Sequence, residues 1–140
     1  MRIFLDTNVL ASGLGTRGLC AELLESVLGN HDLLTSESVL GELERALAEK
    51  FRLPQSLIKE SLRLLRTQGE LVVSARLTTS YVEDAADAEI LACAFARKTD
   101  VFVTGDKALL ALGSLEKIPI RSPRQLWQQL AGIEGPVTPK

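Results

Sequence analysis

The chain opens with Arg2-Ile3-Phe4-Leu5-Asp6, a short apolar run that ends in an acid. A run of this length and composition predicts a buried strand, and the acid falls where that strand ends. Similar runs recur at residues 32–35, 71–74, 101–104 and 118–121. The chain therefore contains enough candidate strands to form one central sheet.

Helical periods separate these runs. Apolar residues recur at helical spacing in segments 20–28, 38–48, 55–65, 85–97, 107–112 and 123–130. Ser36 is a candidate N-cap, and Pro54 stands where a helix start tolerates proline. Strands that alternate with helices indicate βαβ units, so we expect an α/β domain with a parallel sheet covered on both faces.

Length and composition fit one compact domain. The 140 residues are 46% hydrophobic but only 4% aromatic, which suits one core and not a surface that binds nucleic acid by stacking. We expect the domain to span residues 1–131. The tail, 132–140, has no periodicity and contains two prolines, so it is predicted to fray.

The sequence also limits location and partners. No apolar run is long enough for a signal peptide or a membrane span, and Cys20 and Cys93 both lie in apolar helical patterns. These features predict a cytoplasmic protein without a disulfide framework. The net charge of −2 argues mildly against binding of nucleic acid through a large basic field.

Two acids stand at the carboxyl ends of predicted strands, which is where open parallel sheets hold their ligand sites. Asp6 ends the first strand, and Asp106 follows the fourth at the turn into a helix. Each acid taken alone is equally well explained as a helix N-cap.

Helical phase selects two more acids. Glu42 falls at the edge of a buried arc, whereas Glu37 and Glu44 point away from it. Asp87 shares the face of the apolar residues Ile90, Leu91, Ala94 and Phe95. A buried carboxylate needs a capping bond, a salt bridge or a cation, and Asp84 is already available as a cap. A cation is therefore favoured for Asp87.

Four carboxylates at one edge of a sheet repel each other, and Mg²⁺ or Mn²⁺ would relieve that repulsion. Zinc is disfavoured because the one histidine, His31, lies in a polar turn and the two cysteines are far apart. No nucleophile and base pair is visible, so hydrolysis by metal-activated water is the mechanism that remains.

Segments 3–10, 35–43, 87–94 and 103–110 resemble, in order, the four motifs of PIN domains. The likeness runs from Arg2 to about Leu130 and looks closest to the VapC-like toxins of bacterial and archaeal toxin–antitoxin pairs. It implies a three-layer α/β/α sandwich with a parallel sheet in the order 3-2-1-4-5. It also implies a metal-dependent endoribonuclease that acts on RNA, with a protein antitoxin as partner and a homodimer as assembly.

The resemblance carries the family's catalytic and metal-binding acids to four positions, which are Asp6, Glu42, Asp87 and Asp106. It assigns hydrogen-bonding support to Asn8, Ser36 and Thr104. One departure concerns segment 82–87, which lacks the proline and the extra acid that this branch has before its third acid. Asp84 therefore stays an alternative ligand, although helical phase favours Asp87.

A glycine-rich string at residues 13–18 matches the dinucleotide-binding fingerprint. It does not follow the first strand directly, so the site for a pyrophosphate is missing and no nucleotide cofactor is expected. We expect a flexible loop beside the site, in which Arg17 is a candidate contact for an RNA phosphate. Lys107 either binds phosphate or caps a helix.

Two further functions compete with the nuclease. A haloacid-dehalogenase-like phosphatase also has an acid after one strand and Gly105-Asp106 after another, but it needs an aspartate where this chain has Asn8. The other alternative is a PIN-type RNA-binding or interaction module without catalysis, against which the four intact acids argue. The basic stripe of Lys59, Arg63 and Arg66 is more simply a solvated helix face.

Overall fold

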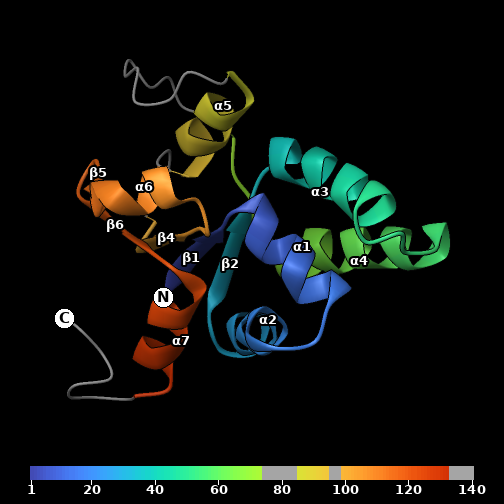
Figure 1. Cartoon of the computed structure of the whole chain (residues 1–140), viewed down its shortest axis with the longest axis horizontal. Coiled ribbons are helices and arrows are strands. Elements are labelled where there is room, and N and C mark those ends of the chain that lie inside the picture. Colours follow the sequence, from blue (N-terminus) through green and yellow to red (C-terminus); the bar gives the residue numbers. More distant parts are fainter. Residues whose placement is uncertain (74–84, 95–98, 133–140) are drawn as a thin grey trace.

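A computed structural model of the chain describes residues 1–73, 85–94 and 99–132, with the backbone alone at residues 85–89 (Figure 1). The described strands are β1 (Arg2–Leu5), β2 (Asp32–Thr35), β3 (Glu70–Leu71), β4 (Val101–Val103), β5 (Ser114–Leu115) and β6 (Ile118–Arg121). The described helices are α1 (Thr7–Gly15), α2 (Leu19–Asn30), α3 (Glu37–Glu49), α4 (Gln55–Gln68), α5 (Ala85–Ala94), α6 (Lys107–Leu112) and α7 (Pro123–Leu130).

The strands form one sheet in the order β3-β2-β1-β4-β6-β5. The first five in this order pair in parallel, which confirms the predicted order 3-2-1-4-5. The short β5 was not expected and pairs antiparallel with β6. Its hairpin turn consists of Glu116 and Lys117, with φ of 52° and 67°. Turns with two positive φ angles usually carry Asn-Gly, so this one gives no sequence signal.

Both faces of the sheet are covered, as the α/β/α architecture requires. Successive strand residues point to opposite faces, and Ile3, Phe4 and Leu5 of β1 are all 0% exposed. The rings of Phe4 and Phe102 stack with their centroids 5.8 Å apart, which joins β1 to β4 on one face. Helices α2 and α7 pack together, whereas α3 packs against α1, α4 and α5 (Figure 1).

Parallel pairing brings three junctions between a strand and a helix to one edge of the sheet. Each junction has a polar residue that caps the following helix: Asp6 accepts from the Thr7 amide, Ser36 from the Val39 amide, and Asp106 from the amides of Ala108 and Leu109. The predicted N-cap at Ser36 is thereby confirmed. Asp6 and Asp106 are caps as well, so the structural explanation of these acids holds whether or not they also have a function.

The flexible loop expected at residues 13–18 is wrong for residues 13–15, which belong to helix α1, whereas residues 16–18 form a short bend between two helices. Helix α1 runs through Gly15, and α2 begins at Leu19 after Gly18, whose φ of 135° favours glycine. A Cβ at Gly15 would lie 2.6 Å from Cδ1 of Phe51. The glycine therefore lets α1 pack closely against the end of α3, and it provides neither a phosphate cradle nor a flexible loop.

The end of helix α5, the two cysteines and the hydropathy of the helices were also subjects of prediction. Helix α5 is described to Ala94, and the rest of the predicted helix lies outside the described residues, as do Asp84 and the tail from residue 133. Cys20 and Cys93 are not joined to each other by a disulfide, and burial raises the pKa of the Cys20 thiol. Of the helices that the structure describes, not one combines the length and the hydropathy needed to cross a membrane.

Candidate active site

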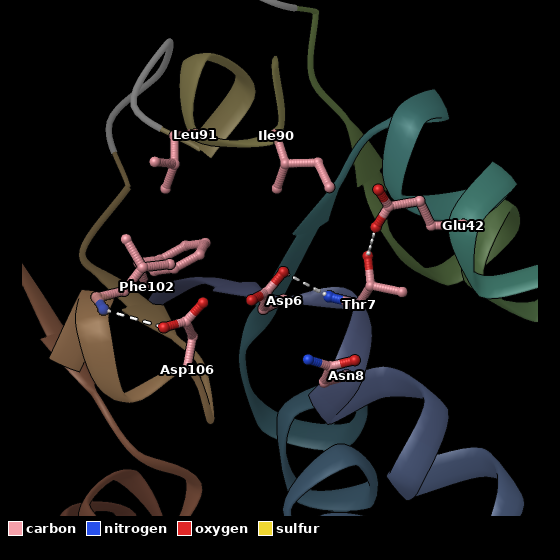
Figure 2. A pocket seen from close by; sticks show the side chains of 9 residues that line it. Asp6, Thr7, Asn8, Glu42, Ile90, Leu91, Phe102 and Asp106 are labelled. Carbon is pink, nitrogen blue, oxygen red and sulfur yellow. Dashed lines mark hydrogen bonds between the residues drawn. The ribbon is translucent and has the colours of Figure 1, made fainter. Parts of the chain in front are cut away.

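A pocket of about 140 Å³ opens at the carboxyl edge of the sheet (Figure 2). Its polar lining comes from the start of α1, from α3 and from the start of α6, namely Asp6, Thr7, Asn8, Glu42 and Asp106. Its apolar lining comes from α5, β4 and α6, namely Ile90, Leu91, Phe102 and Leu109. The pocket thus joins three of the four predicted acids, which are 36 or more positions apart in the sequence.

Asp6 is held at both carboxylate oxygens. Oδ1 accepts from the Thr7 amide at 2.8 Å, and Oδ2 accepts from the Thr104 hydroxyl at 2.7 Å. Thr104 is completely buried, so this donor is fixed in place. Asp6 is half-buried and lines the pocket with its carboxylate oriented by these two donors.

Thr104 links Asp6 to Asp106. Its hydroxyl accepts from the Asp106 amide at 3.0 Å while it donates to Asp6. The Oδ1 atom of the exposed Asp106 accepts from the Ala108 amide at 2.8 Å, which leaves Oδ2 without a hydrogen-bond partner in the described part of the chain. The position of Thr104 between the two acids agrees with the hydrogen-bonding support expected of it.

Glu42 lies at the rim of the pocket, on the half-buried side of α3. Its Oε1 atom accepts from the Thr7 hydroxyl at 3.0 Å (Figure 2). Glu37 and Glu44 on the same helix are exposed. The helical phase that selected Glu42 from among these three acids is thus confirmed by its placement.

The fourth predicted acid, Asp87, belongs to the described backbone of α5, but its side chain lies outside the described residues. Helix α5 contributes Ile90 and Leu91 to the pocket wall, so the helix that carries Asp87 borders the pocket. Among the side chains that are described, no three His, Cys, Asp or Glu residues are close enough together to hold a metal ion. The choice between Asp84 and Asp87 stays open.

The other residues expected to support the site or to contact RNA differ in whether they lie at the pocket. Asn8 is exposed and lines the pocket, and Lys107 is exposed at the start of α6. Ser36 is buried and its recorded bond caps α3 rather than contacting an acid. Arg17 lies beyond the far end of α1, against a shallow hollow formed with α2. Its contact with RNA stays a prediction, although the loop that carries it is only the short bend at residues 16–18.

One polar residue of the pocket, Thr7, was missed by the sequence reasoning. Its amide contacts Asp6 and its hydroxyl contacts Glu42, so it touches two of the predicted acids. The available signal was its position, directly after an acid at a strand end. That signal was lost because the sequence pattern did not predict helix α1, which begins at Thr7.

Neutral groups provide the recorded hydrogen bonds to the three acids in the pocket. Glu42 and Asp106 form no salt bridge with any described residue, and the salt bridges that are present join Arg2 to Glu70 and Arg66 to Glu37. Carboxylate, amide and hydroxyl oxygens are the ligands that hard divalent cations prefer. The arrangement is chemically suited to such a cation.

The acidic pocket of this α/β fold lies at the carboxyl edge of the parallel sheet, which is where proteins with open sheets of this class hold their ligand sites. A family model described as the PIN domain matches residues 2–108. This chain therefore belongs to the PIN-domain family, whose members are generally nucleases. The match leaves the phosphatase and the dinucleotide-binding interpretations without support.

A solved structure has the same fold. The chain is similar to one chain in the crystal structure of VapBC2 from Rickettsia felis bound to a DNA fragment from their promoter, with a TM-score of 0.63 and 16% sequence identity. The similarity covers 87% of this chain and 98% of that chain. At this identity it shows the shared fold. No curated protein is similar enough in sequence to be matched.

Proposed function

We propose that this protein is a metal-dependent endoribonuclease and the toxin of a toxin–antitoxin pair. The observation that carries the proposal is the convergence of Asp6, Glu42 and Asp106 on one pocket, where their recorded hydrogen-bond donors are neutral. Glu42 and Asp106 form no salt bridge with a described residue, and carboxylates of this kind are suited to balancing the charge of a metal ion.

The donor set fits Mg²⁺ or Mn²⁺. All candidate ligand atoms are oxygens, and the Oε2 atom of Glu42 and the Oδ2 atom of Asp106 have no partner in the described part of the chain. No three acids among the described side chains are close enough together to hold an ion by themselves, so Asp6, Glu42 and Asp106 would hold it together with Asp87 and with water between the ion and part of the set. Helical periodicity supports Asp87, because it precedes Ile90 and Leu91 by three and four residues and those two side chains line the pocket.

When bound, the ion supplies an activated water and polarises the scissile phosphate of RNA. The residues of the chain prepare for that chemistry. Thr104 keeps Asp6 and the start of α6 in a fixed relation, and the exposed amide of Asn8 is available to donate to a phosphate oxygen. The apolar wall of the pocket limits water on one side. Hydrolysis of the phosphodiester would leave a 5′-phosphate and a 3′-hydroxyl.

The proposed partner is a protein antitoxin, and the proposed assembly is a homodimer in the cytoplasm. The family match and the similar fold of a chain from the Rickettsia felis VapBC2 complex support a place in this class of system. RNA as the substrate rests on the likeness to VapC-like toxins. The net charge of −2 predicts that contacts near the site, rather than a broad basic surface, would orient the strand.

The test is cleavage of single-stranded RNA by the purified full chain, without antitoxin, in the presence of Mn²⁺. We expect EDTA to abolish cleavage and Asp6→Asn to reduce its rate more than ~100-fold. Asparagine retains an oxygen that can cap α1, so the variant should remain folded. Asp100→Asn is the matched control, because Asp100 lies at the opposite edge of the sheet and accepts from the Arg2 amide at 2.7 Å.

Cleavage that persists in EDTA or in Asp6→Asn would contradict the proposed nuclease. RNA that binds tightly to the wild type with Mn²⁺ but remains intact would identify the non-catalytic RNA-binding module instead. Equal losses of cleavage rate in Asp6→Asn and Asp100→Asn would show that the acids at the carboxyl edge do not form the catalytic site.

A further inference from the structure

Thr7 joins two helices at the mouth of the pocket. It is the first residue of α1 and is 6% exposed, and its hydroxyl crosses to the Glu42 carboxylate on α3 at 3.0 Å. Figure 2 shows Thr7 between Asp6 and Glu42, with one hydrogen bond to each. This single residue therefore contacts two of the three described acids.

We propose that Thr7 is the positioning residue that holds the Glu42 carboxylate in place to bind the metal ion. The inference rests on the proposed metal-dependent function of the pocket. Thr7 was not among the residues that the sequence selected, because those residues were acids chosen by their position at a strand end or by helical phase.

Glu42 needs such a partner more than the other acids do. Its side chain has three rotatable bonds before the carboxylate, it sits at a half-exposed rim, and it forms no salt bridge with a described residue. The Thr7 bond is its one hydrogen bond within the described part of the chain. Repulsion from Asp6 and Asp106 favours rotamers that turn Glu42 toward solvent until a cation is bound. A fixed donor opposes that turn.

Thr7 is suited to be that donor because it is rigid. Its side chain branches at Cβ, which restricts its first torsion angle, and it is buried at the start of a helix that Asp6 caps. Thr7 and Thr104, both buried, hold different acids of the site. Thr104 holds Asp6 and the Asp106 backbone, and Thr7 holds Glu42.

The start of the helix also leaves the hydroxyl available. Inside a helix, a threonine hydroxyl commonly bonds a carbonyl three or four residues back, as Thr67 does with the carbonyl of Arg63 at 3.0 Å. The residue four positions before Thr7 belongs to strand β1 rather than to a preceding helical turn. The Thr7 hydroxyl is thus directed across to α3.

The first test measures Mn²⁺ affinity by calorimetry for the wild type, Thr7→Val and Thr7→Ser. Valine has the same shape without the hydroxyl, and we expect it to weaken binding ~10-fold or more, as is usual when a hydrogen-bonding partner of a ligand is lost. Serine retains the donor and should restore affinity close to that of the wild type. Thr7→Ala repeats the comparison if valine prevents folding.

Thr35→Val is the matched control. Thr35 is also a fully buried threonine, at the carboxyl end of β2, but its hydroxyl has no hydrogen-bond partner in the structure. The same chemical change there should leave Mn²⁺ affinity unchanged. An equal loss of affinity in Thr35→Val and Thr7→Val would show a general packing effect and overturn the inference.

A double-mutant cycle tests whether Thr7 acts through Glu42. In a Glu42→Ala background, Thr7→Val should cause no further loss of Mn²⁺ affinity, because the carboxylate that it positions is gone. The RNA cleavage rate should follow the same pattern through kcat and the Mn²⁺ dependence, with little change in KM for RNA. A loss of the same size in both backgrounds would overturn the proposal.

The two proposals fail in different ways. A wild type that binds Mn²⁺ with the expected Thr7 dependence but leaves RNA intact would refute the nuclease and support the role of Thr7. A wild type that cleaves RNA while Thr7→Val retains full affinity and rate would refute the role of Thr7 alone. A wild type that binds no Mn²⁺ in the pocket would refute both.

Discussion

The two edges of the sheet both collect acids, but they balance the charge differently. Where the strands begin, Arg2 donates to Glu70 through two bonds of 3.0 and 3.2 Å, and its amide donates to Asp100. The hydrogen bond that Arg2 donates to Glu70, with the charges of Glu70, Asp32 and Asp100, raises the pKa of the Arg2 guanidinium. Acids at this edge have a protein cation beside them and are explained by structure.

Where the strands end, the donors recorded for Asp6, Glu42 and Asp106 are backbone amides and threonine hydroxyls. Such groups orient carboxylates without neutralising them. The comparison shows that the number of acids at an edge is less informative than the charge of their partners. The edge with neutral donors is the one that we assign to a metal ion.

The largest expected effect is stabilisation by the ion itself. At a Mn²⁺ concentration ~100 times Kd, the wild type should gain about 2.7 kcal/mol in the free energy of unfolding. Glu42→Gln should lose most of this gain, whereas Glu70→Gln at the other edge should keep it. Thermal unfolding followed by circular dichroism, with and without Mn²⁺, measures the difference. A similar gain for both variants would remove the distinction between the edges.

The second largest effect is expected without metal, for Glu70→Gln at the edge where the strands begin. Glu70→Gln replaces one partner of a two-bond, charge-assisted pair whose side chains are 28% and 38% exposed. We expect a loss of roughly 1 kcal/mol in urea unfolding, because partial exposure reduces the value of the pair. In EDTA, Glu42→Gln should be neutral or stabilising, since it removes one of several like charges. Destabilisation of equal size at the two sites would contradict the comparison.

A smaller stabilisation is expected from Thr35→Val, at the carboxyl end of β2. The buried Thr35 hydroxyl has no hydrogen-bond partner among the residues that the structure describes, and valine fills the same volume without the cost of an unsatisfied polar group. The free energy of unfolding should rise by about 0.5–1 kcal/mol. Thr104→Val, which breaks two recorded bonds, should lower it instead. Urea unfolding of the two variants gives the sign of each change.

The smallest effect concerns an exposed pair outside both edges. Arg66 donates to Glu37 at 2.9 Å, and this bond lowers the pKa of Glu37 below its usual 4.5. A carboxyl with a lowered pKa stabilises the fold above 4.5, and the stabilisation disappears as pH falls through the lowered value. Glu37→Gln should therefore cost a few tenths of a kcal/mol at pH 7.

Unfolding at pH 7 and pH 3, with and without about 1 M NaCl, checks the Glu37 prediction. The difference between Glu37→Gln and the wild type should shrink at low pH and in salt, because solvent ions screen exposed charges. A difference that grows as the pH falls would show that the sign assigned to this pair is wrong.

Much of the fold was predictable because local patterns and sheet geometry agree. The apolar runs located β1, β2, β4 and β6, and parallel pairing brings their carboxyl ends to one edge. Helical phase then placed Glu42 correctly, because a 100° step per residue separates it from Glu37 and Glu44. These inferences need only periodicity and strand order.

The features that were missed depend on contacts between distant residues. Helix α1 was hidden by glycines that disfavour helices, and the close contact of Gly15 with Phe51 becomes visible only when α1 and α3 are packed. The Thr7 bond to Glu42 spans 35 residues and has no local signature. Strand β5 consists of two residues before an atypical turn. Tertiary packing, rather than local propensity, determines all three.

The most direct test of the central claim is a crystal structure of the full chain soaked in Mn²⁺, with anomalous scattering to locate the ion. The account predicts an anomalous peak in the pocket between Asp6, Glu42 and Asp106, and none beside Glu70 and Asp100. It also predicts that the peak disappears in Asp6→Asn. An empty pocket at a Mn²⁺ concentration that supports RNA cleavage, or a peak at the edge where the strands begin, would contradict it.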